Sequence, residues 1–442
     1  MFTFLKNVFK KGELRQKVIF TLGILFVYRL GAAITIPSVN TGALSSSDAT
    51  NGIFGIMNLL GGGTLERFSL FSLGVSPYIT SSIIIELLSM DVIPALSQWR
   101  KEGNTGKKKK DRVTRYVTLF LAALQGGVLT YAFDNGYKIL ADSSIWTYIY
   151  VVLIMMAGSM LAVWLGDQIT NKGIGNGVSL LIFTGIVSNL PSSFISTFNN
   201  LVDTSGKAGD MWLGIAWYAL FVVVYLSIVI FVVFNEGAVR KIPIIYATSS
   251  NTTMRTKDQT HMPIKINSSG VIPVIFASSV LAAPRTVVSF METSDVTKWI
   301  NTIFNYQEPV GFVLYILMII GFTFFYSNLQ IDAEKISDDL KKNGGAIPGV
   351  RTGVDTMKHI KTILNRVTVV GSLSLCIIAA IPIITPVIWS QTANASLSLG
   401  GTGLIIVTGV ALETVKQIKT HITRKEYHGY IRREYKKEGA II

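Results

Sequence analysis

The sequence is poor in charged residues and nearly lacks cysteine. Only 15% of its 442 residues are Asp, Glu, Lys or Arg, half are hydrophobic, and the mean hydropathy is +0.48. This composition is too apolar for an ordinary soluble protein, so we expect the lipid bilayer to be the main solvent. The single cysteine, Cys376, excludes an internal disulfide and a four-thiolate metal site, and we interpret it as a packing residue.

Patterns that would indicate an enzyme are also missing. The sequence has no GxxxxGK[ST] loop, and the glycine-rich run 173–177 at the start of an apolar segment is better interpreted as a turn. No grouping indicates a Ser-His-Asp or Cys-His site. The four histidines lack paired metal-ligand spacing: His261, His359, His421 and His428. We therefore predict a protein with no catalytic residues, no metal and no cofactor.

Long apolar segments recur along the whole chain. A membrane-spanning helix needs about 20 mostly apolar residues. Ten segments fit this description, at 18–37, 68–89, 116–133, 146–165, 174–190, 212–234, 270–284, 310–329, 367–388 and 399–413. We predict ten transmembrane helices. The first apolar run ends at Pro37 without a clear cleavage site, so we expect a retained span and not a removed signal peptide.

The positive charge follows the alternation of the spans. The formal net charge of +14 could indicate nucleic-acid binding, but with a cytoplasmic N-terminus 34 of the 40 Lys and Arg lie at the ends or in cytoplasmic loops. One other lies in the first span, Arg29, and only five lie in the opposite loops: Arg67, Lys138, Lys207, Arg285 and Lys298. The positive-inside rule therefore predicts that both termini are cytoplasmic.

The spans differ in side-chain size. Spans four, six, eight and nine are rich in large aliphatic and aromatic residues, and we expect them to form much of the outer wall. Spans two, five, seven and ten are interrupted by Gly, Ser, Thr and Pro. Such residues are tolerated where helices pack closely or border a water-filled cavity, so these four spans should line the centre.

The interrupted spans occupy equivalent places in two sets of five. An odd number of spans reverses orientation, so this arrangement suggests an inverted repeat with halves 1–190 and 191–415. We expect large cytoplasmic loops at about 235–266 and 330–366, and a cytoplasmic tail at 416–442. The predicted fold class is an all-α integral membrane protein of ten helices in two inverted five-helix halves.

Motifs distributed from the second span to the tenth resemble, in order, those of the SecY family. They are Ser69–Leu88, Gly166–Thr170 with Gly173–Gly177, Pro263–Ser279, Gly344–Arg351, Gly400–Val407 and Thr414–Gln417. The chain departs from the family in three places. Glu86 stands where glutamine is usual, Asp332-Ala333 replaces a common Asn-Pro, and Thr352 follows Arg351 where proline is common.

The resemblance implies an hourglass pore closed by a ring of aliphatic side chains. Such a ring, set among helices of small residues, can exclude water and still deform around a passing chain. For any one position, ordinary helix packing is the alternative. The ring carries over to Val75, Ile79, Ile182, Ile275 and Ile406.

The segment at about 53–67 is apolar but too short and too rich in glycine to span a membrane. In the family, a movable plug helix lies here and seals the resting pore; an ordinary extracellular re-entrant segment is the alternative. The positions that we assign to the plug are Phe54, Met57, Leu59, Leu60, Gly62 and Leu65.

A channel that releases apolar segments into lipid needs a seam in its wall. By resemblance this lateral gate lies between spans two and seven, at Thr80, Ile83, Glu86, Asn267 and Ser278. Glu86 has two open interpretations, a polar latch of the gate or an interfacial acid near the cytoplasmic end.

The basic cytoplasmic loops are candidates for docking. By resemblance, Arg240, Lys241 and Arg351 meet the motor ATPase SecA or the ribosome, whose RNA would bind them in a salt-dependent way. Ordinary topology-setting charge is the alternative for these residues. The family also implies the small membrane subunits SecE and SecG, unfolded preproteins with signal sequences as clients, and a bacterial plasma membrane.

These expectations combine into a passive channel for unfolded polypeptide, driven by its partners. The main rival is a secondary transporter for a small solute, which shares inverted repeats and broken helices but predicts a polar ligand site at the midplane. The candidate central residues are aliphatic instead. A membrane-embedded protease is a third class, and the sequence shows no evident catalytic pair for it.

Overall fold

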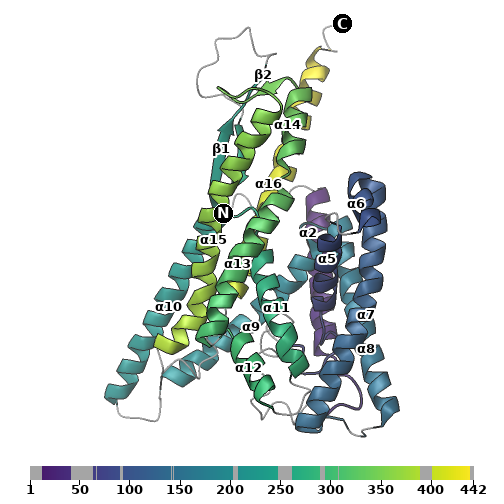
Figure 1. Cartoon of the computed structure of the whole chain (residues 1–442), viewed down its shortest axis with the longest axis vertical. Coiled ribbons are helices and arrows are strands. Elements are labelled where there is room, and N and C mark those ends of the chain that lie inside the picture. The colour runs from purple at the N-terminus through teal and green to yellow at the C-terminus, as the bar shows by residue number, and fades with distance from the viewer. Residues whose placement is uncertain are drawn as a thin grey trace. The chain divides into compact units, whose positions relative to one another are not determined.

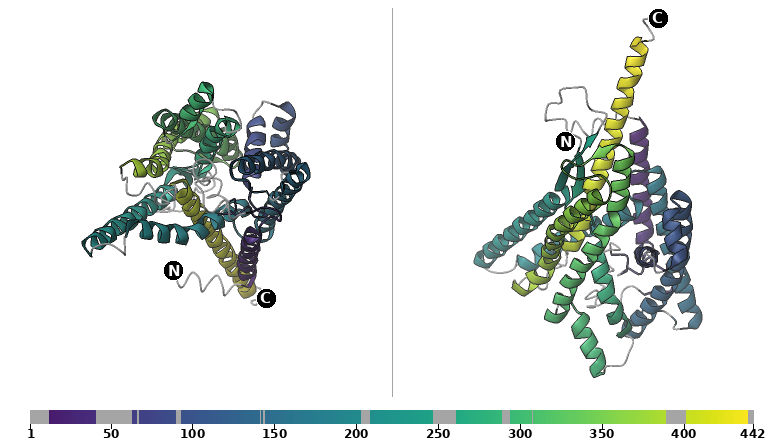
Figure 2. Two further views of the ribbon diagram at one scale, coloured as in Figure 1. Left: turned by 90° about the horizontal axis from the view of Figure 1, so that it is seen from below. Right: turned by 45° about the horizontal axis from the view of Figure 1, so that its top comes forward.

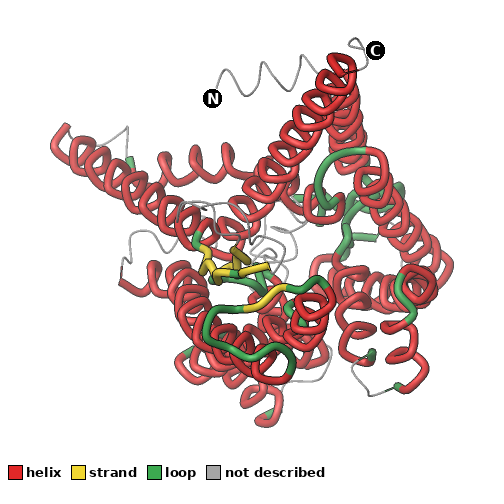
Figure 3. The backbone as a smooth tube through the Cα atoms, turned by 90° about the horizontal axis from the view of Figure 1, so that it is seen from above, coloured by secondary structure: helices red, strands yellow, loops and turns green. Residues whose placement is uncertain are grey.

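The structure of the chain is a computed structural model. It describes residues 12–40, 63–65, 67–89, 93–140, 142, 144–202, 208–246, 261–288, 294–306, 308–388 and 401–438. Helices dominate this part of the chain, and the few strands gather in one place (Figures 1 and 3). Contacts between Cα atoms divide the chain into two units, residues 1–191 with 410–442, and residues 192–409.

Unit 1 is built on three helices that pack side by side. Helix α7 (Asn104–Tyr137) contacts both α5 (Ser76–Leu88) and α8 (Ile145–Lys172), and α2 (Gly12–Ala33) contacts α8. The unit also contains α6 (Pro94–Lys101), the first part of α9 (Gly177–Leu201) and the last part of α16 (Gly401–Glu438). Its main apolar cluster joins α7 and α8 through buried residues such as Ala122, Leu129, Val151 and Met155.

The chain that leads into α5 is not helical, and this corrects a prediction. We predicted a span from 68 to 89, but the helix begins at Ser76 and residues 67–75 form turns. Two backbone hydrogen bonds tie these turns to the end of the first span, Ile36 N to Phe68 O at 2.9 Å and Leu70 N to Ile34 O at 2.9 Å. Non-helical backbone is tolerated at membrane depth only where protein or water satisfies it. Here protein does so through these hydrogen bonds, and the side chains of Phe68, Phe71 and Leu73 are buried.

Unit 2 packs three helices around one apolar cluster. Helix α13 (Pro309–Gln330) contacts both α11 (Ile272–Val288) and α15 (Val354–Ile388), and α10 (Ala208–Gly237) contacts α15. Val232, Ala277, Ile319 and Ile378 are fully or almost fully buried in this cluster, together with Cys376. Cys376 is therefore a packing residue, as the sequence indicated.

The two predicted cytoplasmic loops fold together, which the sequence analysis missed. Strand β1 (Val239–Pro243) pairs antiparallel with β3 (His261–Lys265), and β2 (Ile245–Tyr246) pairs antiparallel with β4 (Gly345–Ala346). Helix α14 (Ala333–Lys342) and the first turns of α15 cover the strands. Their shared core contains Ile242, Ile264, Leu340, Ile360 and Leu364. Because β2 and β4 come from different loops, the loops form one small folded layer.

Each of the ten predicted spans overlaps a helix, but only seven helices in the described part are long and apolar enough to cross a membrane by themselves. Helix α5 has 13 residues and α11 has 17, so two of the expected central spans are short. Helix α16 continues without a break through the predicted tail to Glu438, as Figure 2 shows.

Candidate functional site

The five predicted ring residues are divided between the two units. Val75, Ile79 and Ile182 belong to unit 1, whereas Ile275 and Ile406 belong to unit 2. Val75, Ile182 and Ile406 are buried, with exposed fractions of 5%, 7% and 2%, and the other two are half-buried. None of them is among the exposed side chains. The ring therefore stays a prediction about how the two units assemble.

Helix α5 carries the three predicted gate residues of unit 1, and its start places the first predicted ring residue. Val75 stands at the N-cap of α5, where its carbonyl accepts a hydrogen bond from Ile79 N at 3.0 Å. Pro77 lies in the first turn, where its missing N–H leaves no helical hydrogen bond unmade. The turn chain before Val75 is buried in unit 1, so the position of this ring residue is fixed by packing.

Buried hydroxyl groups fasten α5 to α7. Ser81 Oγ lies 2.5 Å from Thr118 Oγ1 and donates to Thr114 O at 3.2 Å, and both Ser81 and Thr118 are fully buried. A hydrogen bond between helices that water cannot reach is difficult to exchange for another partner. Helix α5, which carries predicted gate residues, is therefore attached to its own unit along the side that faces α7.

Glu86 forms an ion pair with Lys110 of α7. The carboxylate oxygen Oε2 accepts from Lys110 Nζ, and both side chains are about three-quarters buried. Both residues belong to unit 1. The charge that distinguishes Glu86 from the usual glutamine therefore has a cation of its own beside it, one helix away within the same unit.

The predicted gate residues of unit 2 are also held by their neighbours. Asn267 is buried, and its amide nitrogen donates to Glu236 Oε1 of α10 at 2.6 Å while its amide oxygen accepts from Ser269 Oγ at 3.3 Å. Ser278, in α11, donates to Ile275 O at 2.9 Å. Thr80 of unit 1 behaves in the same way and donates to Ser76 O at 3.2 Å, and Ile83 is half-buried.

Of the six predicted plug positions, only one lies within the described residues. Leu65 is 2% exposed and packs in the apolar cluster of unit 1 with Phe68 and Phe133. The other five lie outside the described residues: Phe54, Met57, Leu59, Leu60 and Gly62. The plug stays a prediction.

The predicted docking residues lie on the folded layer of strands. Arg240 and Lys241 are exposed on β1, opposite Ile264 and Pro263 of β3. Arg351 is exposed in the turn between β4 and α15, where its carbonyl accepts from Thr356 Oγ1 at 2.8 Å.

Two of the departures from the family pattern lie in the same layer, and the structure explains the one at Asp332. Asp332 caps α14 by accepting from the backbone N–H groups of Glu334 and Lys335, both at 3.2 Å, and thus starts this helix without the common proline. Thr352 lies in the turn that follows Arg351, between two glycines with positive φ, Gly349 and Gly353. Within the described residues, no group of three or more His, Cys, Asp or Glu side chains could hold a metal ion.

Comparisons with known proteins identify the family and the fold. A sequence model of the SecY family matches residues 69–415. The protein translocase subunit SecY of Bacillus subtilis (strain 168) is 42% identical over 98% of this chain and 100% of its own length. The chain belongs to the SecY family. The same subunit of Staphylococcus carnosus (strain TM300) is 39% identical over 97% of the chain and 99% of its own length.

Solved structures show the same fold. One described as the structure of a protein conducting channel covers 92% of this chain and 92% of its own, with a TM-score of 0.62 and 16% identity. Sec61 in the canine ribosome-channel complex gives a TM-score of 0.59 and 16% identity over 92% of both chains. The SecY-family chain is therefore an α-helical, multi-pass membrane protein with a channel fold.

Sequence reasoning missed the residues that hold the predicted gate residues and their helices in place. The pattern around three of these residues, Lys110, Ser81 and Thr118, is apolar or basic and indicates only a helix. The fourth, Glu236, lies two residues after the sixth predicted span. The acid at position 86 was a signal for Lys110, because a carboxylate near the membrane needs a cation within reach. The basic run 107–110 offered four candidates, and only the packing of α5 on α7 selects one.

Proposed function

We propose that this SecY-family chain is the central channel subunit of a Sec translocon. It passes unfolded secretory polypeptides across the bacterial plasma membrane and releases transmembrane segments sideways into lipid. The observation that carries the proposal is the 42% identity to a protein translocase subunit over practically the full length of both chains. The family model covers residues 69–415, which include the interrupted spans on which the candidate ring and gate lie.

The chemistry of the ring suits a substrate of arbitrary sequence. Aliphatic side chains make no directional contacts. They therefore hold no side chain of the translocated polypeptide tightly enough to stall its movement. The aliphatic side chains of the ring carry no charge and no hydrogen-bonding group. When the ring is closed, they therefore offer an ion nothing that could replace its shell of water. Three ring residues in one unit and two in the other would allow the collar to widen when the units separate.

The partners and the topology are part of the same proposal. We propose that SecA or the ribosome docks on the folded cytoplasmic layer through Arg240, Lys241 and Arg351, and that SecE and SecG assemble around the chain. A docked partner opens the gate if it binds the open state more tightly than the closed one. Sec61 is seen in a ribosome-channel complex, which favours the ribosome as one partner.

Reconstitution tests the proposal as a whole. The purified chain would be placed in phospholipid vesicles with SecE, and then given SecA, ATP and a precursor with a signal sequence. We expect ATP-dependent protection of the precursor from added protease, and its loss when detergent opens the vesicles. Vesicles that never protect the precursor, but accumulate a small solute, would favour a transporter and contradict the channel.

The ring can be tested by one substitution. Ile406→Asn places an amide at a position with 2% exposure, and we expect looser sealing, measured as ion leak from vesicles, and export of precursors with defective signal sequences. Ile406→Leu keeps an aliphatic group and should leave both properties unchanged. Normal sealing and normal signal-sequence requirements in Ile406→Asn would remove this residue from the ring.

A further inference from the structure

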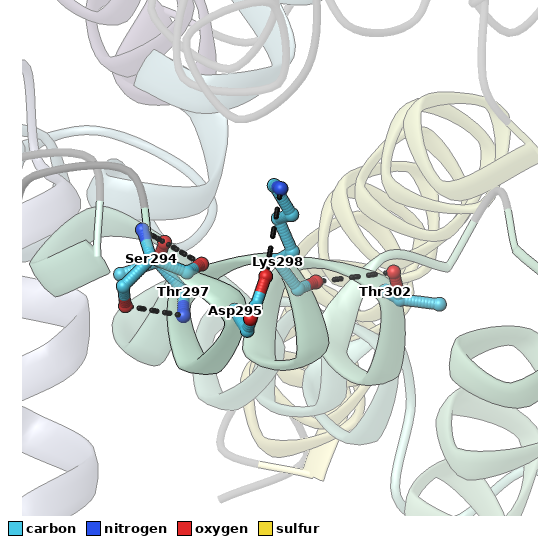
Figure 4. A network of polar contacts seen from close by, with 5 residues as sticks. All are labelled: Ser294, Asp295, Thr297, Lys298 and Thr302. Atoms are coloured by element: carbon cyan, nitrogen blue, oxygen red, sulfur yellow. Dashed lines mark hydrogen bonds and ion pairs between the residues drawn. The ribbon is translucent and has the colours of Figure 1, made fainter.

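A short helix that the sequence analysis did not predict lies between the spans α11 and α13. Helix α12 (Asp295–Phe304) is closed at its start by a capping box: Ser294 Oγ accepts from Thr297 N at 3.4 Å, and Thr297 Oγ1 accepts from Ser294 N at 2.8 Å (Figure 4). Asp295 lies in the first turn, where its negative charge interacts favourably with the positive end of the helix dipole. Its Oδ1 lies 3.6 Å from Lys298 Nζ. The helix therefore has its own start signal and is more than a crossing loop.

Apolar and polar residues lie on opposite faces of α12. Val296, Trp299, Ile300 and Ile303 follow the i, i+3, i+4, i+7 spacing of one helix face. The opposite face consists of Asp295, Lys298, Asn301 and Thr302, all of them exposed. This is the pattern of a helix that lies at a boundary between a polar and an apolar medium.

The protein covers the side of α12 next to the apolar face, leaves Val296 and Trp299 exposed and covers Ile300 and Ile303 in part. Thr297 is 4% exposed, and Phe304 and Tyr306 pack against the main apolar cluster of unit 2. The helix is thus fixed in its rotation, with Val296 65% exposed and Trp299 68% exposed.

The exposed stripe continues into a surface that faces lipid. Helix α13 begins five residues after α12 and presents Val310, Val313 and Leu317 on one side, with exposed fractions of 57%, 57% and 60%. A spanning helix of this apolarity meets hydrocarbon along such a side. Figure 1 shows α12 at the end of unit 2 opposite β1, β2 and α14. With the folded layer at one membrane surface, as in the proposed function, α12 lies near the other surface.

We propose that α12 is a membrane-interface anchor, which lies along the outer bilayer surface with Val296 and Trp299 inserted between phospholipid headgroups and acyl chains. Tryptophan concentrates at this depth because its ring is apolar and its indole N–H is polar. The occupant of the exposed face is therefore phospholipid. The choice of the outer surface rests on the topology of the proposed function. The insertion of α12 into a bilayer surface rests only on its exposed apolar face.

The short length of α11 suggests what the anchor does. Helix α11 has 17 residues, and at about 1.5 Å per residue it spans roughly 25 Å, which is less than the roughly 30 Å of the hydrocarbon core. A short span can slide or tilt in the bilayer. An interfacial helix attached to its outer end fixes its depth, and with it the depth of Ile275 and Ser278.

Spin labels can measure the depth directly. In a Cys376→Ala background, Val296→Cys and Trp299→Cys report on the apolar face, and Asp295→Cys and Asn301→Cys are matched controls on the polar face of the same helix. The labelled full-length chain is reconstituted in vesicles of phosphatidylethanolamine and phosphatidylglycerol. Collision of each label with oxygen, which concentrates in lipid, is compared with collision with a water-soluble nickel chelate.

We expect a higher oxygen-to-nickel collision ratio at 296 and 299 than at 295 and 301. Nickel access at all four positions would overturn the proposal, because the face would then be in water. Access to neither reagent at 296 and 299 would also overturn it, because protein would then cover the face. The measurement needs no transport, so a chain that shows this depth pattern but moves no precursor contradicts the proposed function alone.

A second measurement avoids cysteine variants that fold poorly. Tryptophan fluorescence of the unaltered chain is compared with that of Trp299→Phe in vesicles whose lipids carry bromine at different depths along the acyl chain. The emission lost in Trp299→Phe belongs to Trp299. We expect this component to be quenched most by bromine near the headgroups, and an unquenched component would overturn the proposal.

Discussion

Single residues determine how the gate helix is attached in unit 1, and Glu86 is the clearest example. From the sequence, its acidity could mean either a latch of the gate or an interfacial acid. The structure gives it Lys110 as a partner in the same unit, and neither residue is more than 26% exposed. An acid in place of glutamine is tolerable here because the paired cation removes most of the cost of its burial.

A double-mutant cycle on Glu86 and Lys110 tests this pairing. We expect Glu86→Gln and Lys110→Met each to lower the free energy of unfolding by about 1 kcal/mol, and the double variant to lose less than the sum. Exchange of the two charges should restore part of the stability. Strictly additive losses, measured by thermal unfolding in detergent, would show that the two groups do not interact.

Gly158 is required by the non-helical chain in front of α5. A Cβ atom at this position of α8 would collide with the carbonyl oxygen of Leu70, which is backbone and cannot turn away. We expect Gly158→Ala to lower stability by about 1–3 kcal/mol or to displace the turns. Gly127→Ala is the matched control in α7, where the nearest atom lies 4.0 Å away, and it should be neutral or slightly stabilising. Equal melting temperatures for both variants would contradict the packing.

At the scale of elements, sequence patterns predicted the apolar helices well and their ends poorly. Hydropathy identifies α8, α10 and α13 because each is one long apolar run. It placed the start of the second span eight residues too early, because buried turns such as 67–75 are as apolar as a helix. It also missed β1 and β3, since five-residue strands in a basic loop have no periodicity long enough to recognise.

The folded layer of strands depends on the first turns of α15. Ile360 is fully buried under the strands, so Ile360→Ala should destabilise the layer by about 2–5 kcal/mol. We expect faster proteolysis in the loops at 235–266 and 330–366, and weaker binding of SecA or ribosomes. Lys361→Ala, at the exposed neighbouring position, should leave the cleavage pattern unchanged. If the loops of Ile360→Ala resist proteolysis as well as those of the unaltered chain, the packing of Ile360 is not what holds the docking layer together.

For the whole molecule, the division into units bears on how the channel would open. The boundary falls at Pro191, a proline inside α9 that removes one helical hydrogen bond, and after Gly409 in α16. The predicted ring and gate have members on both sides of this boundary. The predicted gate segments are each fastened within their own unit, α5 by Ser81 and Lys110, and the chain before α11 by the hydrogen bond from Asn267 to Glu236. We therefore expect the gate to open by movement of whole units.

The inverted repeat and the ring could be predicted from the sequence only as patterns. Interrupted spans at equivalent places indicate which helices are central, but pairing of Lys110 with Glu86, or of Glu236 with Asn267, depends on packing between segments 24 and 31 residues apart. Such contacts leave no periodic signal along the chain. Family motifs supplied the names of the ring residues, and hydropathy alone could not have separated them from other buried aliphatic side chains.

Cross-linking of a precursor halted in transit tests the central claim most directly. Single cysteines would be placed in a Cys376→Ala background at the ring positions Val75, Ile79, Ile182, Ile275 and Ile406, and at the exposed controls Leu226 of α10 and Leu317 of α13. A cysteine in the middle of the halted precursor should form disulfides with all five ring positions and with neither control. Adducts at the controls and none at the ring would show that the polypeptide does not pass through the predicted centre.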